Sequence, residues 1–570
     1  MPALRSHPEV HDVVVVGSGA GGATVAHVLT DLGIRVTLLE AGPRLDPYEE
    51  FKEHNWPYDF THRGAEDGGA SYFGTGKPFG FFWTTSGGYE LEGEPYTVAD
   101  DTNDFWWFRS RSVGGRTNHY GRMSYRFSDY DFKPRDRDGL GWNWPIGYED
   151  VSPYYDKAER FIGVVGSHEG IRSAPDGIFH DPPPPKAHEL LIQRASHKMG
   201  IPCIPNRRAV ITRSINGRPA CHYCGQCGRG CQGGSNYSAS QTQIFPALDT
   251  GRLELIDMAM AREITIDGNG QVNGIIYVDK RTGHEQRLRC RVLVLAASAC
   301  ESARLLLNSR PSDHPNGVAN SSGVVGRYLM DTVGYEIGGI VPALEGMPRY
   351  NSDGAGGAHL YMPWWGLERE RELGFPRGYH IEIGGGYQMP GIGMFGASAQ
   401  TAGYGSAIKA QAYRDYGTRV SFAGRGEMIP NEASYCEIDP NVVDRYGIPV
   451  LRFHFKWSEH ERNQAKHMNA VFSELILSMG GTPQPPGSPY ASGISIGGSI
   501  IHEVGAVRMG NDPRRSVLNG FCQAHDASNL FVCDAGSFVS MPDKNPTLTI
   551  NALAWRASEY LGEEMRRGEL

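Results

Sequence analysis

A strand, a glycine-rich turn, a helix and a second strand follow one another near the start of the sequence, and this unit limits what the chain can fold into. Residues 13–16 are a run of four valines, which is typical of a strand buried on both faces of a sheet. Helical spacing of apolar residues follows over 23–32, and residues 36–39 form a second buried run. A strand, helix and strand in this order predict a parallel sheet with a right-handed crossover.

Three glycines mark the turn between the first strand and the helix. Gly17, Gly19 and Gly22 form G-x-G-x-x-G, in which the first permits a tight turn, the second lets the backbone approach a pyrophosphate, and the third lets helix and strand pack closely. The helix N-terminus adds free N–H groups and a positive dipole. Glu40 ends the second strand, where a carboxylate binds a ribose diol. We therefore predict a dinucleotide site. The Ala-Gly-Pro that follows at 41–43 is typical of flavoproteins and favours FAD over a free nicotinamide cofactor.

Composition excludes several classes of protein. Hydrophobic residues are 40% and charged residues 21% of the 570 positions, which is the balance of a globular enzyme and not of a disordered chain. The formal net charge is −9 and no basic stripe stands out, so we expect no nucleic-acid binding. The sequence contains no apolar run long enough to cross a membrane, so we expect no membrane-spanning helix. The first ten residues lack an apolar core and a twin-arginine pair, so we expect no export signal in the chain itself.

Four of the ten cysteines fall within one short segment: Cys221, Cys224, Cys227 and Cys231. Gaps of two residues are ferredoxin-like and let thiolates converge on one iron–sulfur cluster. Gln232 stands where bacterial ferredoxins have proline, and the fourth cysteine of those proteins serves a second cluster, so both a 4Fe–4S and a three-ligand 3Fe–4S cluster stay open. Zinc and free thiols or disulfides are the alternatives.

Three further blocks accompany the glycine motif: 111–119 (RSVGGRTNH), 292–308 (VLVLAASACESARLLLN) and the C-terminal block 502–555. Together the four blocks resemble the glucose-methanol-choline (GMC) oxidoreductases, which are FAD-dependent alcohol oxidases and dehydrogenases. The resemblance implies an α/β, Rossmann-like FAD-binding domain and a substrate-binding domain built on an antiparallel β-sheet. For the FAD-binding domain we expect residues 1–135, 206–330 and 495–570, with a Cys-rich loop inserted at 206–245; for the substrate domain, 136–205 and 331–494.

The same resemblance makes His502 and Asn545 the catalytic pair. The chemistry is reasonable, because a neutral histidine is the usual base near pH 7 and a neighbouring amide hydrogen-bonds the developing alkoxide. Asn545 precedes Pro546, so we also expect it to cap a helix whose positive end faces the flavin.

The resemblance further implies which residues lie along the flavin. These are Gly114, Gly115, Asn118, His119, Asp534, Ala535, Asn545 and Thr547. Some relatives carry a histidine at the position of His119 that is covalently joined to the flavin. We expect noncovalent FAD, with a covalent link to His119 as the alternative.

These features predict oxidation of a secondary hydroxyl of a sugar or glycoside to a ketone. Hydride goes to flavin N5, and electrons leave through the iron–sulfur cluster to an acceptor such as cytochrome c. The substrate class rests on a looser resemblance to bacterial glucoside 3-dehydrogenases and gluconate dehydrogenases. The main alternative is an oxygen-using pyranose or alcohol oxidase without a working cluster. A flavin-bearing electron-transfer subunit is disfavoured by His502 and Asn545.

Partners and location are implied by the same relatives. Dehydrogenases of this kind work with a cytochrome c and a small subunit whose signal exports both chains. This implies a periplasmic enzyme carried by its partner, with a cytoplasmic enzyme as the alternative.

Overall fold

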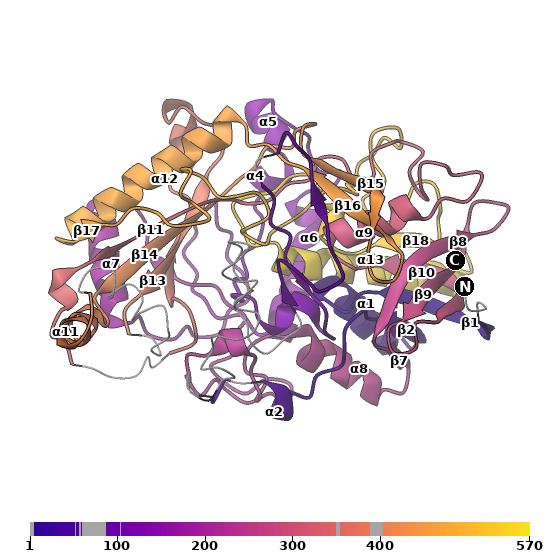
Figure 1. Cartoon of the computed structure of the whole chain (residues 1–570), viewed down its shortest axis with the longest axis horizontal. Helices are drawn as coiled ribbons and strands as arrows, with labels where there is room; N and C mark the ends of the chain where they lie inside the picture. Colours follow the sequence, from indigo (N-terminus) through magenta and orange to yellow (C-terminus); the bar gives the residue numbers. More distant parts are fainter. Residues whose placement is uncertain are drawn as a thin grey trace.

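The computed structural model of the chain describes residues 5–51, 53–55, 59, 87–102, 104–348, 354–387 and 403–570. A seven-stranded sheet forms one side of the molecule (Figure 1). Its order is β7-β2-β1-β10-β9-β8, and β18 also pairs with β10. The strands are β1 (Arg5–Val16), β2 (Val36–Leu39), β7 (Leu253–Ile256), β8 (Ala259–Ile266), β9 (Val272–Asp279), β10 (Glu285–Leu295) and β18 (Leu530–Val532).

The predicted parallel unit is confirmed at the centre of this sheet. Residues 13–16 of β1 pair in parallel with β2 on one side and with residues 292–295 of β10 on the other. Side chains on both faces of β1 are therefore buried here, which explains the unbroken run of valines. The last three residues of β10 pair in parallel with β18, so the C-terminal region completes the sheet.

Helices from both ends of the chain pack together beside this sheet. The crossover helix α1 (Ala20–Asp31) contacts α13 (Thr547–Arg567), and α13 contacts α6 (Tyr148–Ile162). The position of α13 differs slightly from expectation, because Pro546 and not Asn545 occupies the N-cap. Assignments of helix ends commonly differ by one or two residues.

A second sheet forms the other side of the molecule (Figure 1). It has six strands, all antiparallel to their neighbours, in the order β17-β11-β14-β13-β12-β6. Helix α12 (Glu459–Ser478) lies across β11 and β14. The predicted antiparallel region is thus confirmed, apart from residues 349–353 and 388–402, which fall outside the described part. The strands are β6 (Ile204–Pro205), β11 (Val333–Ile340), β12 (Leu360–Met362), β13 (Tyr379–Gly385), β14 (Arg419–Gly426) and β17 (Thr482–Pro483).

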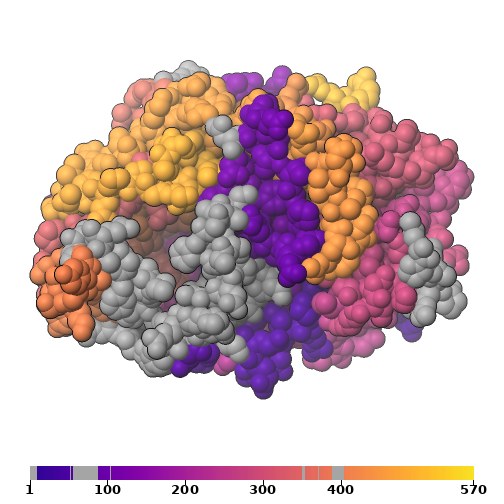
Figure 2. Space-filling view, in the orientation of Figure 1, coloured from indigo at the N-terminus to yellow at the C-terminus, as the bar shows by residue number. Residues whose placement is uncertain are grey.

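A small third sheet joins distant parts of the sequence. β15 (Tyr435–Val443) and β16 (Pro449–His454) form a hairpin, and β16 pairs in parallel with β4 (Thr97–Val98). The space-filling view shows this orange hairpin against the violet segment on the front of the molecule (Figure 2). The predicted domain boundaries stay a prediction. Both α6 and the hairpin, which they assign to the substrate domain, contact helices beside the first sheet, α13 and α9 (Ala299–Asn308) respectively.

None of the helices in the described ranges is long and apolar enough to cross a membrane.

The remaining α-helices and strands are shorter than α6, α12 and α13. The other elements are β3 (Gly87–Gly88), β5 (Arg109–Ser110), α2 (Pro47–Glu50), α4 (Asp129–Phe132), α5 (Pro134–Asp138), α7 (Ala187–Lys198), α8 (Phe245–Asp249) and α11 (Ser406–Asp415).

Candidate active site

A cavity of about 550 Å³, lined by residues of both large sheets, gathers most of the predicted site residues. Its walls include both the glycine turn and the two members of the predicted catalytic pair. The predicted residues that line it are Gly17, Gly19, Glu40, Gly115, His119, Cys227, His502, Asp534, Ala535, Asn545 and Thr547.

The dinucleotide end of the cavity is built for an anion and a diol. The N-terminus of α1 has no side-chain cap and no acidic residue in its first turn, so its N–H groups are available to a phosphate. Glu40 is buried. Its Oε2 accepts hydrogen bonds from Ser18 N (3.2 Å) and Ser18 Oγ (2.5 Å), whereas its Oε1 accepts only from Gly42 N (2.8 Å), which leaves Oε1 a lone pair for a ribose hydroxyl. An added Cβ at Gly19 meets no atom within 4 Å, so open space adjoins this backbone. These residues fit the ADP half of FAD.

Three of the predicted cofactor-binding residues, one in the glycine turn and two of the flavin neighbours, do not line the cavity and have different roles. Gly22 lies against Gly17, where an added Cβ would come within 1.9 Å of the carbonyl oxygen. Gly114 adopts a left-handed turn with φ of 94°, and Asn118 closes that turn with a 2.9 Å hydrogen bond to Val113 O. These residues shape the backbone behind the cavity wall.

The space beside Gly19 permits a selective test of cofactor binding. Gly19→Val is expected to leave the fold intact, because φ at this position is −69° and an added Cβ meets no atom within 4 Å. The side chain would instead occupy the place of the pyrophosphate, so we expect the Kd of FAD to rise by roughly tenfold or more. Fluorescence titration of the apoprotein measures this. Wild-type FAD affinity would contradict the prediction, while Gly17→Val, which clashes with Ala296 O, should instead prevent folding.

His502 and Asn545 meet at the other end of the cavity. Their Nε2 and Nδ2 atoms lie 3.2 Å apart. The amide N–H is a donor, so Nε2 is the acceptor, and the proton is on Nδ1, which donates to Thr332 Oγ1 at 2.9 Å. The backbone N–H of His502 donates to Asp331 Oδ1 at 3.0 Å. The ring is therefore held with its unprotonated nitrogen toward the amide.

An ion pair that the sequence analysis missed lies behind Asn545. Asn545 Nδ2 also donates to Glu382 Oε1 at 3.2 Å. The other oxygen of this carboxylate, Oε2, lies 3.3 Å from Arg425 Nη2. Both charged residues line the cavity, on adjacent strands β13 and β14. The only sequence signal was the alternation in β13, where His380 and Glu382 share one face between apolar residues.

Burial and neighbouring charges together set the protonation of His502, Glu382 and His119. It lowers the pKa of His502 to about 3, with a further lowering by Arg425 that Glu382 opposes. The imidazole is therefore neutral at physiological pH. Burial also raises the pKa of the Glu382 carboxyl, but the nearby Arg425 and His380 outweigh it and hold that pKa well below the usual range. At the other histidine, His119, burial again dominates and lowers the pKa to about 3.

The cysteine loop borders the same cavity through Cys227 and Gly228. All four cysteines are free thiols. Among the described residues, no group of three cysteine sulfurs lies within 4.8 Å of one another. A tetrahedral zinc ion about 2.3 Å from each sulfur would need them about 3.8 Å apart, whereas an iron–sulfur cluster uses one iron for each thiolate and spaces them more widely.

Burial raises the pKa of the Cys221 thiol to about 11, that of Cys224 to about 12 and that of Cys231 above its usual value, which favours neutral thiols in the absence of a metal. Two features of the loop surroundings oppose this and would stabilise anionic sulfur. Cys227 Sγ accepts the Gly356 N–H and Cys221 Sγ accepts the Tyr223 N–H, both at 3.3 Å. Arg122 is fully buried, and its guanidinium donates to carbonyl oxygens that include Cys227 O at 2.7 Å. In the part of the chain described, no carboxylate forms an ion pair with it.

Comparison with known proteins identifies the class. The GMC oxidoreductase N-terminal family model matches residues 11–333 and the C-terminal model matches 430–554. A 2-methyl-1,2-propanediol dehydrogenase of Mycolicibacterium austroafricanum is 31% identical over 96% of this chain and 95% of its own. The fructose dehydrogenase large subunit of Gluconobacter japonicus is 26% identical over 98% of both chains. The structure of pyridoxine 4-oxidase from Mesorbium loti is similar over 97% of this chain and 99% of its own, with a TM-score of 0.62 and 15% sequence identity.

The fold and the cavity thus define an oxidoreductase with a dinucleotide-binding sheet and an antiparallel cap. The chain belongs to the GMC oxidoreductase family, whose members use FAD to oxidise the CH–OH groups of alcohols and sugars.

Proposed function

We propose that the chain oxidises a secondary hydroxyl of a sugar or glycoside to a ketone. The observation that carries the proposal is the contact of neutral His502 with Asn545 in a cavity that reaches the dinucleotide turn. When bound, FAD supplies the acceptor for the hydride that leaves the carbinol carbon. We assign Gly17, Gly19 and Glu40 to its ADP half.

In this proposal His502 Nε2 removes the hydroxyl proton. Its lone pair is exposed to substrate once the Asn545 amide turns its N–H toward the substrate oxygen, where it stabilises developing negative charge. Thr332 keeps the ring in the required tautomer. Asp534 holds the backbone beside the cavity, since its carboxylate accepts Gly536 N (2.7 Å) and Ser298 N (3.1 Å). We expect FAD to be noncovalent, because His119 Nε2 contacts Ser110 Oγ at 3.1 Å; acid precipitation should release the flavin.

The polar end of the cavity favours a polyol. Glu382 and Arg425 present acceptors and donors close to Asn545, and such groups suit a ring with several hydroxyls. The relatives support both a sugar, in fructose dehydrogenase, and a small diol, in 2-methyl-1,2-propanediol dehydrogenase.

Anaerobic mixing of the oxidised enzyme with a panel of substrates tests the choice. We expect glucosides and gluconate to bleach the flavin faster than 1,2-diols at equal concentration, because the diols leave the buried charges partly unmatched. Faster reduction by the diols would show that the substrate is a small alcohol and not a sugar. No reduction by either class would remove the proposed reaction.

The lowered pKa of His502 predicts an unusual pH profile. A base is lost when the pH falls through the pKa of its conjugate acid, here about 3 and not 6.5. Flavin reduction should therefore stay within about twofold between pH 8 and pH 5, whereas a histidine with the ordinary pKa near 6.5 would lose about 30-fold at pH 5. Single-turnover stopped flow measures this step. An acid limb near pH 6.5 would show either that His502 titrates normally or that the reaction needs ionised Asp331, whose pKa burial raises to about 7.

We further propose that Cys221, Cys224 and Cys227 hold a 3Fe–4S cluster, or that these three together with Cys231 hold a 4Fe–4S cluster. The N–H···S contacts and the buried Arg122 support anionic sulfur there. Such a cluster supplies a one-electron relay toward an external acceptor such as cytochrome c. Turnover with oxygen equal to that with cytochrome would favour the oxidase alternative.

Electron transfer through such a cluster requires a partner protein that accepts the electrons. The fructose dehydrogenase relative is named as a large subunit, which supports assembly with other chains. We propose a cytochrome c and a small export subunit as these partners. Fractionating cells that express the chain alone and with neighbouring reading frames decides between periplasm and cytoplasm; cytoplasmic location in both cases would remove the export subunit.

A further inference from the structure

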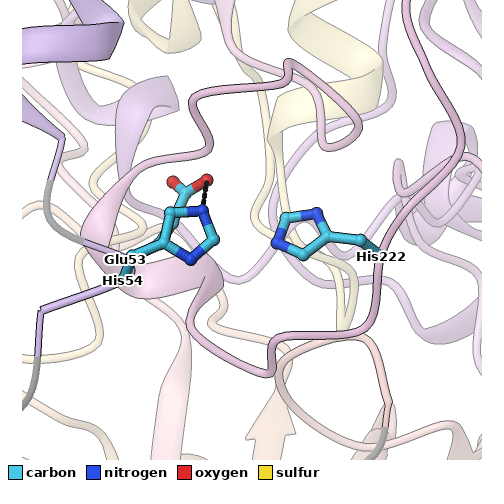
Figure 3. Close-up of side chains that lie close together, drawn as sticks. All are labelled: Glu53, His54 and His222. Atoms are coloured by element: carbon cyan, nitrogen blue, oxygen red, sulfur yellow. Dashed lines mark ion pairs between the residues drawn. The ribbon is translucent and has the colours of Figure 1, made fainter.

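A second group of ligand-type side chains lies outside the active-site cavity. Glu53, His54 and His222 each offer one ligand atom, and these atoms all lie within 4.8 Å of one another. His54 Nε2 is 3.5 Å from Glu53 Oε1, and the two imidazole rings are 5.3 Å apart between centroids. Figure 3 shows the ring of His222 directed across a gap toward the ring of His54 and the carboxylate of Glu53.

Glu53 is the unusual member of this group. Its side chain is only 1% exposed. Both carboxylate oxygens accept the same Gln232 N–H at 2.8 Å, which leaves lone pairs on each. Within the described ranges its one ion-pair partner is His54, and no lysine or arginine lies within 4.0 Å. Arg122 and His54 act on this carboxylate electrostatically, and a carboxylate so deeply buried is stabilised further when a bound cation joins it.

The group joins two segments that are already docked. Gln232 Nε2 donates to Phe51 O at 3.2 Å, and Arg229 Nη1 donates to Asn55 O at 2.7 Å. His222 directly follows Cys221 in the cysteine loop, while Glu53 and His54 come from the segment after α2. A ligand bound by all three would therefore hold the loop to that segment.

We propose that Glu53, His54 and His222 bind a divalent cation of the zinc class. Two imidazoles and one carboxylate suit zinc and similar borderline ions and do not suit magnesium or calcium, which take oxygen ligands. His54 and His222 are solvent-exposed, so the ion can enter and keep water in its open position. No cysteine sulfur belongs to this group of described ligand atoms, and the site does not depend on the proposed reaction.

Calorimetric titration of the FAD-loaded protein with Zn²⁺ tests the site. We expect one strong equivalent in the wild type, and an affinity at least about tenfold weaker in His54→Ala and in His222→Ala, since each removes a ligand. His460→Ala, which removes an exposed histidine of α12, is the matched control and should bind like the wild type. Unchanged affinity in both His54→Ala and His222→Ala would overturn the proposal.

Zinc-edge X-ray absorption separates this site from the cysteines. We expect only nitrogen and oxygen neighbours at about 2.0–2.2 Å, whereas sulfur neighbours at about 2.3 Å would place the ion on the cysteine loop and contradict the site. Glu53→Gln removes the buried charge but can also disturb folding. The two histidine variants, which change exposed side chains, keep the test decisive.

Discussion

Replacing His502 with alanine is expected to slow flavin reduction by at least about 10²-fold, the scale on which a general base contributes. The reason is local. Only Nε2 of this ring carries a free lone pair toward Asn545, and burial keeps it unprotonated at neutral pH. Stopped-flow mixing under anaerobic conditions isolates the reductive step, and the absorbance of released flavin shows whether FAD content is unchanged.

A milder variant distinguishes the loss of the base from the loss of the hydrogen bond that orients its ring. Thr332→Val removes the hydroxyl that receives Nδ1–H but keeps the shape of the side chain. We expect a smaller loss than in His502→Ala, with normal FAD content. Reduction of His502→Ala at the wild-type rate would exclude this histidine as the base, whatever the result for Thr332→Val.

Changing Cys224 to serine is expected to remove the iron from the protein. Wild-type protein should contain roughly three or four irons and matching acid-labile sulfide per chain, and a hydroxyl is a poor ligand for iron in a soft site. Flavin reduction by sugar should survive, because the groups around His502 are untouched. Reduction of cytochrome c or a large dye should fall. Iron analysis and electron paramagnetic resonance of the isolated protein measure the loss without relying on turnover.

Cys290→Ser is the matched control for this experiment. Cys290 is a buried cysteine of β10, far along the chain from the loop, so its replacement should leave the iron in place. Stoichiometric zinc without iron in the wild type would make the loop a structural clip. Iron retained in Cys224→Ser, or iron lost with cytochrome reduction untouched, would contradict the relay.

Features fixed by a short stretch of sequence were predictable. The valine run, the glycine turn and Glu40 lie within one strand–helix–strand unit, so spacing alone places the turn beside the end of the second strand, where Gly17 N–H donates to Leu39 O. The pairing of His502 with Asn545 came from the family resemblance and not from spacing. The structure brings them together, while their roles stay a prediction.

Features created by strand register were not predictable. Glu382 and Arg425 face the cavity because β13 and β14 pair antiparallel, with His380 opposite Arg425. No local pattern sets that register. A motif also does not tell which of its residues touch the ligand. Gly114 and Asn118 belong to the predicted flavin motif, yet they shape the backbone behind the cavity wall.

The order of strands in the first sheet has a consequence for synthesis of the protein. β1 pairs with β10, nearly three hundred positions further along, and β10 pairs with β18 close to the C-terminus. Sheets assembled from such distant segments fold slowly, because long loops must close before the pairing stabilises them. The nucleotide-binding sheet therefore cannot be completed before β18 has been synthesised, and capture of the cofactor becomes a late event in the formation of the protein.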